Sequence, residues 1–136
     1  MSSPPAGFEP YDGAGPFLGL VGPVHVRGEG ANRVFGLRMD GRHLNHRGSV
    51  QGGLLATLVD FAIGRAIHAD AEGDMEAATV SLTTDYLGPA EEDDWVEAHT
   101  EVDRVGGTLA FADCSLLVGE REVVRGRAVF AVLSKG

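Results

Sequence analysis

The chain has 136 residues, of which 43% are hydrophobic, and a formal net charge of −9. This length suits one domain with one core, and the hydrophobic content is too high for a disordered protein. The acidic balance argues against nucleic-acid binding and against adhesion to an anionic membrane, because both require a basic face. An anionic ligand would therefore have to be bound by local arginines or by backbone amides.

The cellular location follows from the cysteine count and from the missing apolar segments. Cys114 is the only cysteine, so no internal disulfide forms, and a reducing compartment is favoured. No apolar run approaches the ~20 residues of a membrane span. Residues 1–19 lack the basic start and apolar core of a secretory signal. We therefore expect a cytoplasmic protein with no membrane association.

Residues 1–23 hold five of the six prolines and several glycines. This composition predicts a loosely ordered arm with at most one short turn of helix, and we assign residues 1–17 to it. A single domain would then cover residues 18–136. It begins with two strands predicted over residues 18–26 and 32–39, and a polar loop over residues 40–52 follows.

Residues 53–69 form the only convincing helix in the sequence. Apolar side chains cover nearly its whole circumference, which predicts burial on most sides. The exceptions are Thr57, Asp60 and Gly64, with His68 four residues further on, and this spacing places them on one stripe. A carboxylate among apolar residues is costly unless it is paired, hydrated or functional. Asp60 is therefore the first candidate for chemistry.

Four strands are predicted after the helix, and short links join them. Such links imply an antiparallel meander, and a curved antiparallel sheet wrapped around the helix is the economical way to bury both. The free edges of that sheet could be closed by a second copy of the chain. The strands cover residues 77–86, 95–105, 108–118 and 123–133.

Several common catalytic motifs are missing. The sequence contains no nucleophile elbow and no Walker A loop, and Gly28-Glu29-Gly30 lacks the third glycine of a dinucleotide site. His43 and His46 are three residues apart, but no companion ligand follows at metal-site spacing. Cys114 lies mid-strand and is interpreted as a small core residue rather than a catalytic thiol. We expect neither a metal nor a cofactor.

The start of the helix offers a second candidate site. Gly52 and Gly53 let a ligand approach the backbone, and the first-turn amides have no intrahelical partner, so they can bind an oxyanion. Asp60 lies roughly 10 Å further along the axis, too far to act there on the same chain. A partner chain packed antiparallel could bring its own Asp60 close. In the alternative interpretation, the glycines only permit the turn and local hydrogen bonds hold Asp60.

The run Asn45…Gln51-Gly52-Gly53-Leu54-Leu55-Ala56-Thr57-Leu58-Val59-Asp60 resembles the motif of the hotdog-fold acyl-CoA thioesterases, in particular the PaaI-like branch of the phenylacetate pathway. Residues 78–90 and 104–111 resemble the next strand and the following hairpin of that family. The resemblance extends over about residues 18–133. It implies an α+β hotdog fold, in which a six-stranded antiparallel sheet wraps one long buried helix.

The resemblance also implies roles for individual residues. Asp60 matches the catalytic carboxylate, which acts as a general base on water or as a nucleophile. Gly52, or less well Gly53, matches the amide that polarises the thioester carbonyl, and Asn45 matches a residue that holds the water or the thioester. Thr79 matches a hydroxyl from the partner subunit that steadies the water near the carboxylate. Asn45 and Gly52 of one chain would then face Asp60 and Thr79 of the other.

Gln51 departs from the family pattern, because the usual residue before the two glycines is histidine. Glutamine can donate and accept hydrogen bonds but does not titrate near neutral pH. We expect Phe61 and Gly64 to shape the acyl pocket. Arg104, beside a Gly-Gly turn, is the first choice for a coenzyme A phosphate; the other candidates are Arg42, Arg47, Arg65 and Arg121.

The resemblance thus implies a thioester hydrolase acting on a small or aromatic acyl-CoA. Coenzyme A is part of the substrate, so no cofactor is needed. Shared sites imply a homodimer, and the family favours a homotetramer. One alternative is a hotdog dehydratase, which ranks low because that branch generally uses a histidine. The other is a non-catalytic acyl-CoA-binding hotdog module, an alternative that stays open because Gln51 replaces the usual histidine.

Overall fold

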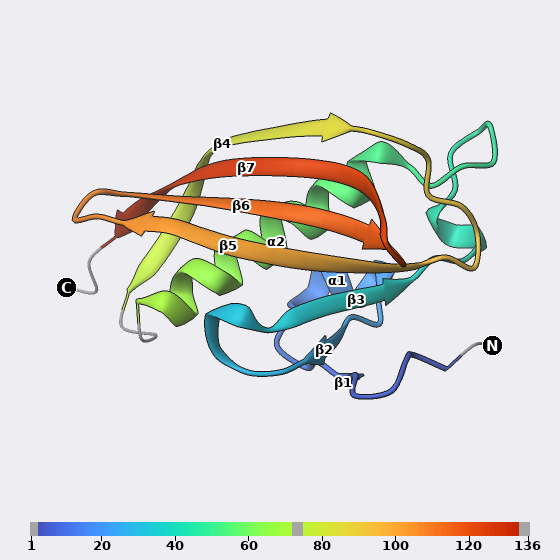
Figure 1. Ribbon diagram of the computed structural model, residues 1–136, viewed down its shortest axis with the longest axis horizontal. Coiled ribbons are helices and arrows are strands. Elements are labelled where there is room, and N and C mark those ends of the chain that lie inside the picture. The colour runs from blue at the N-terminus through green and yellow to red at the C-terminus, as the bar shows by residue number, and fades with distance from the viewer. Residues whose placement is uncertain (1–2, 72–74, 134–136) are drawn as a thin grey trace.

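One curved antiparallel sheet wraps around a long helix in the computed structural model, which describes residues 3–71 and 75–133 (Figure 1). The sheet has seven strands in the order β1-β2-β3-β5-β6-β7-β4. The strands are β1 (Glu9–Pro10), β2 (His25–Arg27), β3 (Val34–Arg38), β4 (Glu76–Tyr86), β5 (Trp95–Val105), β6 (Leu109–Val118) and β7 (Arg121–Leu133). The helices are α1 (Pro16–Val21), α2 (Gly52–Asp70) and two 3₁₀ turns, η1 (Gly30–Asn32) and η2 (Gly41–His43).

The predicted long helix and the four strands after it are found within one or two residues of their expected ends. The prediction of a strand over residues 18–26 is wrong, because residues 18–21 belong to α1 and β2 has three residues. Gly15, at φ 88°, turns the chain, and Pro16 then occupies the first helical position, where its fixed φ suits a helix start. An apolar run this short does not distinguish a helix from a strand.

The N-terminal segment is attached to the sheet at two points. Its β1 pairs with β2, which adds a seventh strand to the six predicted. Phe8 is buried in a small cluster with Val34 and Trp95. Residues 1–2 of the predicted arm, 72–74 of the predicted link after the helix, and 134–136 at the end of the predicted domain lie outside the described residues. The boundary between residues 17 and 18 stays a prediction.

The meander holds for β5, β6 and β7 only. The first of the four late strands, β4, pairs with β7 at the far edge of the sheet, so the expectation that β4 lies beside β5 is wrong (Figure 1). Residues 87–94 therefore cross the end of the sheet. Three strand spacings amount to about 14 Å, and an extended link of this length reaches up to about 26 Å. The link is thus long enough for a crossover.

Close approach of α2 to the sheet fixes the position of Asp60. Val59 is fully buried, and a Cβ at Gly126 of β7 would lie 2.5 Å from its Cγ1 atom. Only glycine at that position allows α2 to lie so near β7.

Cys114 is 1% exposed, which confirms the prediction of a core residue, and burial raises the pKa of its thiol to about 12. None of the helices in the described ranges is long and apolar enough to cross a membrane.

Candidate active site

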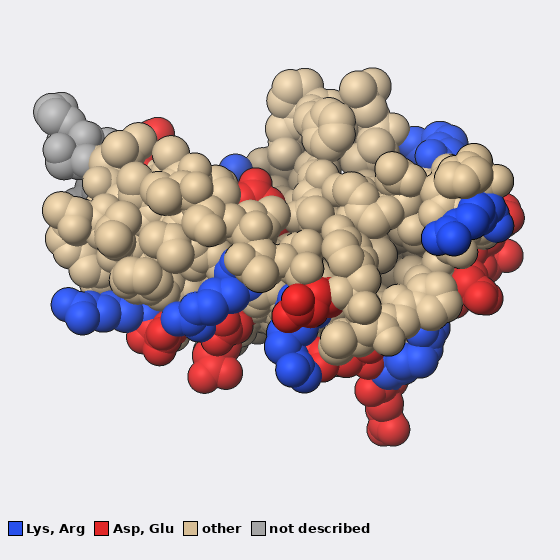
Figure 2. Space-filling model, turned by 90° about the horizontal axis from the view of Figure 1, so that it is seen from above, with Lys and Arg blue, Asp and Glu red and all other residues tan. Residues whose placement is uncertain are grey.

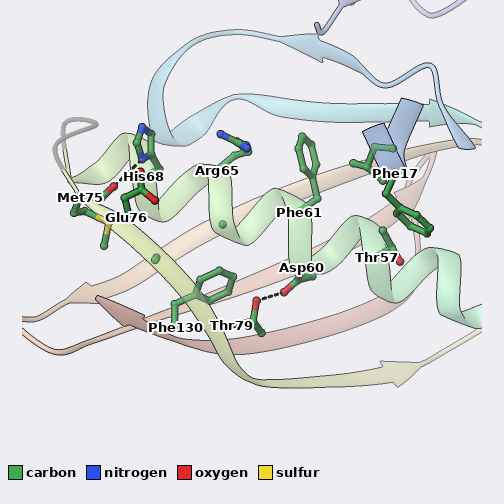
Figure 3. Close-up of a pocket in the computed structure, with 13 residues that line it drawn as sticks. Phe17, Thr57, Asp60, Phe61, Arg65, His68, Met75, Glu76, Thr79 and Phe130 are labelled. Carbon is green, nitrogen blue, oxygen red and sulfur yellow. Dashed lines mark hydrogen bonds between the residues drawn. The ribbon is translucent and has the colours of Figure 1, made fainter. Parts of the chain in front are cut away.

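A cavity of about 530 Å³ runs along the side of α2 that the sheet leaves uncovered (Figure 3). The predicted stripe of Thr57, Asp60, Gly64 and His68 lines it, so the helical spacing identified the right face of the helix. Asp60 is partly exposed to this cavity, although Leu58, Val59, Ala62 and Ile63 are buried. The apolar part of the lining comes from Phe17, Leu18, Phe61, Met75, Ala77 and Phe130.

Asp60 and Thr79 meet at the wall of this cavity. The Thr79 hydroxyl donates a hydrogen bond of 2.7 Å to Oδ1 of Asp60 in the same chain (Figure 3). This hydrogen bond joins α2 to β4 and orients the carboxylate. Sequence reasoning paired the two residues only through the family resemblance, since no local pattern connects positions 19 residues apart.

A β-bulge at Val80 decides which side chains of β4 face α2. Thr79 pairs with Phe130 and Ser81 pairs with Val129, so Val80 is the extra residue, and it is 61% exposed. Leu82, three residues after Thr79, packs against the core, which shows that the alternation of the strand has shifted by one. The bulge therefore lets Thr79 reach Asp60 while Leu82 still faces inward.

The start of α2 borders a second cavity of about 320 Å³, which Asn45 and Gly52 both line. Gln51 is the N-cap residue and makes no side-chain capping hydrogen bond, so it leaves the first-turn amides to other partners. Tyr86, at the end of β4, donates a hydrogen bond of 2.7 Å from its hydroxyl to the Gly52 carbonyl. A Cβ at Gly52 would lie 3.3 Å from the Tyr86 ring. Sequence reasoning missed Tyr86, which carries no local signal beyond its position at a strand end.

Asn45 shapes the loop before the helix. Its side-chain oxygen accepts hydrogen bonds from the backbone amides of Arg47, at 2.8 Å, and Ser49, at 3.2 Å. This oxygen is already used within the loop, so a ligand contact from Asn45 would come from its side-chain NH₂ group.

His43, near this loop, has a structural role. His43 is 2% exposed; its Nδ1 accepts from the Asp40 amide at 2.9 Å, and its Nε2 lies 2.6 Å from the Val21 carbonyl. Nδ1 acts as the acceptor, so Nε2 carries the proton and donates to Val21. No group of three or more His, Cys, Asp or Glu residues within ranges 3–71 and 75–133 is placed to hold a metal ion.

The nine predicted site residues thus separate into three sets. Asp60, Phe61, Gly64 and Thr79 line the first cavity, and Asn45 and Gly52 line the second. The other three, Gln51, Gly53 and Arg104, line neither cavity.

The four other arginines considered for coenzyme A fall into two groups, those bonded within the chain and those that line a cavity. Arg42 is bonded to Asp40 and to two backbone carbonyls, and Arg121 is bonded to the Pro89 carbonyl. Arg47 lines the second cavity and Arg65 lines the first.

Comparison with known proteins identifies the family. The model of the thioesterase superfamily matches residues 47–125, a range that holds α2, the bulge and most of the sheet. The chain belongs to the thioesterase superfamily. A candidate esterase of Pseudomonas aeruginosa is 40% identical to this thioesterase over 131 residues, which cover 96% of this chain and 98% of the relative.

Two solved structures show the same fold as this thioesterase. The PaaI protein of Escherichia coli, from the phenylacetic acid degradation operon, is 19% identical, with a TM-score of 0.79 over 88% of this chain and 86% of that one. A hypothetical thioesterase of Streptococcus pneumoniae, solved with coenzyme A, is 22% identical, with a TM-score of 0.73 over 82% of this chain and 89% of that one. At these identities the likeness shows the fold alone. The predictions of a hotdog fold and of a thioester hydrolase are confirmed.

Proposed function

We propose that this thioesterase hydrolyses a small or aromatic acyl-CoA to the free acid and coenzyme A, as a member of the PaaI-like branch. The observation that carries the proposal is the Asp60–Thr79 pair at the wall of a cavity of about 530 Å³. This volume lies in the range of small-molecule sites, and three phenylalanines line it. The coenzyme A complex of the Streptococcus pneumoniae thioesterase supports coenzyme A as the carrier of the acyl group.

The chemistry requires one base and one oxyanion donor. Asp60 acts as the base: it takes a proton from water while the water oxygen bonds to the thioester carbon. The tetrahedral intermediate then collapses, the carbon–sulfur bond breaks, and the thiolate takes the proton back from Asp60. The hydrogen bond from Thr79 orients the carboxylate that takes the proton in the first step. Direct attack by Asp60 on the carbonyl is the second route, and it would use the same residues.

The oxyanion donor comes from a second copy of the chain. Gly52 lies eight residues before Asp60 on α2, about 12 Å along the helix axis, and borders the other cavity. We therefore propose that Asn45 and Gly52 of one chain complete the site around Asp60 and Thr79 of its partner. Each chain then contributes half of two identical sites, as a two-fold dimer requires.

The edge of the sheet at β4 supports this dimer. The strand lies at the end of the strand order, so half of its backbone groups are free to pair with another chain. Val80, Tyr86 and Leu87 are large exposed hydrophobic residues on and just after it. Figure 2 shows that much of this side of the molecule is free of charged residues. Pairing of two such dimers into a homotetramer is a further part of the proposal.

A complementation experiment tests the shared site. Asp60→Asn removes the base, and Gly52→Pro removes one amide hydrogen at the first helical position, where proline is tolerated. Gln51 is already extended (φ −60°, ψ 127°), as a residue before proline must be. Gly52→Ala is the matched control, because it adds a Cβ beside Tyr86 but keeps the amide hydrogen.

We expect each of the two homodimers to release almost no thiol from acyl-CoA. A purified heterodimer of Asp60→Asn and Gly52→Pro chains should recover about half of the wild-type activity, because one of its two sites is intact. An inactive heterodimer would refute the shared site. Wild-type protein that binds acyl-CoAs but releases no thiol from short, long or aryl substrates would instead be the non-catalytic module.

A cytoplasmic location is also proposed, and the free buried Cys114 supports it.

A further inference from the structure

Arg65 lines the Asp60 cavity without a carboxylate partner. It follows Asp60 by five residues on α2 and is half-buried, and its guanidinium carbon lies 5.7 Å from the centre of the Phe61 ring. Figure 3 shows Phe61 and Arg65 projecting from α2 on one side and Asp60 projecting toward Thr79 on the other. No carboxylate in the described part of the chain lies within ion-pair distance of Arg65.

The chain has 20 acidic residues and only 11 basic ones, and arginines such as Arg125 and Arg127 on the outer face of the sheet each bind a carboxylate. Five of its ten arginines form no ion pair with a described carboxylate, and Arg65 is the one among them that lines the Asp60 cavity. Partial burial of a charge has a cost that a pairing anion removes. Asp60 lines the same cavity, and its carboxylate is bonded to Thr79 rather than to Arg65.

The Phe61 ring holds the guanidinium in place. A cation over an aromatic face is attracted to it, and stacking leaves the N–H donors at the edge of the guanidinium plane free. Those donors match the two oxygens of a carboxylate. Asp60 and Arg65 line the same cavity, so an acyl group whose thioester lies at Asp60 can end at Arg65 within that cavity.

We infer that Arg65 binds a carboxylate at the far end of the acyl group, so that the preferred substrates are short acyl-CoAs derived from dicarboxylic acids. This inference rests on the proposed thioesterase function and makes its substrate class more specific. Phe61, Phe130 and Met75 would contact the methylene groups between the thioester and the carboxylate. In a protein of net charge −9, a local arginine is what allows such an anion to enter.

The test compares two thioesters of matched shape. Glutaryl-CoA carries the terminal carboxylate, and 5-methylhexanoyl-CoA carries an isopropyl group in its place. We expect Arg65→Gln to lower kcat/KM for glutaryl-CoA about ten- to hundredfold and to leave that for 5-methylhexanoyl-CoA nearly unchanged. For glutaryl-CoA, the kcat/KM of Arg65→Lys should lie between the values of the wild type and of Arg65→Gln, because lysine keeps the charge but loses the paired donors.

Arg125→Gln is the matched control, since it removes an arginine from the outer face of the sheet and should leave the ratio of the two substrates unchanged. Equal losses on both thioesters in Arg65→Gln would refute the inference, because a contact with coenzyme A or a folding defect affects both. Unchanged kcat/KM for both thioesters in Arg65→Gln would refute it too. In either case, hydrolysis of both substrates by the wild type would leave the thioesterase function intact. A wild-type protein that hydrolyses neither would refute the function and the inference together.

Discussion

The Thr79 hydroxyl on β4 lies 2.7 Å from the Asp60 carboxylate on α2 and donates a hydrogen bond to it. The contact depends on the bulge at Val80, which places Thr79 and Leu82 on the same side of β4. A carboxylate oxygen engaged in this way is held in one orientation. The other oxygen of Asp60 remains available for water in the cavity.

Removing the hydroxyl should lower turnover while the fold is kept. Thr79→Val replaces the hydroxyl with a methyl group of similar volume, and a hydrogen bond to a charged group is worth about 1.5–3 kcal/mol. We expect kcat for acyl-CoA hydrolysis to fall about ten- to hundredfold with little change in KM. Thr79→Ser, which keeps the hydroxyl, should retain most of the activity. Equal losses in the two variants would show that the methyl packing, not the hydrogen bond, supports Asp60.

The contact between Gly126 and Val59 should couple the sheet to the site. A Cβ at position 126 would lie 2.5 Å from Val59 Cγ1, so Gly126→Ala forces α2 away from β7. We expect a loss of about 1–3 kcal/mol in the free energy of unfolding, together with lower kcat, because Asp60 follows Val59 directly. Urea unfolding and thiol release measure the two effects.

Val59→Ala provides the control for that substitution, because it removes the methyl groups with which the new Cβ would collide. The double variant should be more stable than the sum of the single changes predicts, and its kcat should partly recover. Strict additivity in both measurements would contradict a direct contact between these two positions.

Local periodicity predicted the parts of the fold that depend on neighbouring residues in the sequence. The stripe of Thr57, Asp60 and Gly64 identified both the helix and its cavity face, because helical spacing places those positions together whatever the rest of the chain does. Local composition and the short links between segments likewise located the late strands. The glycine pair marked the start of α2, and the family motif added the roles of its neighbours.

Features that depend on contacts between distant residues could not be predicted from the sequence. The position of β4 beside β7 depends on which strand edges meet, and a link of eight residues permits either a hairpin or a crossover. The bulge at Val80 follows from the pairing of β4 with β7, and no turn residue marks it. Arg65 appeared as one of several arginines, because only the structure shows which of them have carboxylate partners and which line a cavity.

Two arginines can be compared for contact with the phosphates of coenzyme A. Arg104 remains the prediction from the sequence, while Arg47 lines the cavity at the start of α2. If Arg104 binds a phosphate, Arg104→Ala should raise KM for acyl-CoA about tenfold with little change in kcat, and Arg47→Ala should not. An N-acetylcysteamine thioester lacks the phosphates, so its KM should be the same in both variants and in the wild type. A KM for acyl-CoA that rises in Arg47→Ala alone would transfer the role to Arg47.

Alkaline pH should destabilise the protein through Cys114. Burial raises the pKa of its thiol from its ordinary value near 9 to about 12, so between these values the folded state holds a proton that the unfolded state has lost. Stability is therefore unaffected by this group below pH 9 and falls as the pH rises above it, by up to about 1.4 kcal/mol per pH unit. Cys114→Ala removes this dependence.

We thus expect the free energy of unfolding of the wild type, measured in urea, to decrease relative to that of Cys114→Ala by about 2 kcal/mol between pH 8 and pH 10.5. The variant is less stable at pH 8, because truncation leaves a small cavity in the core, so the two curves converge as the pH rises. A thiol reagent provides an independent measurement: it should label Cys114 only as fast as the protein opens, because the buried side chain is protonated and inaccessible. A constant difference between the two proteins across this pH range would contradict the raised pKa.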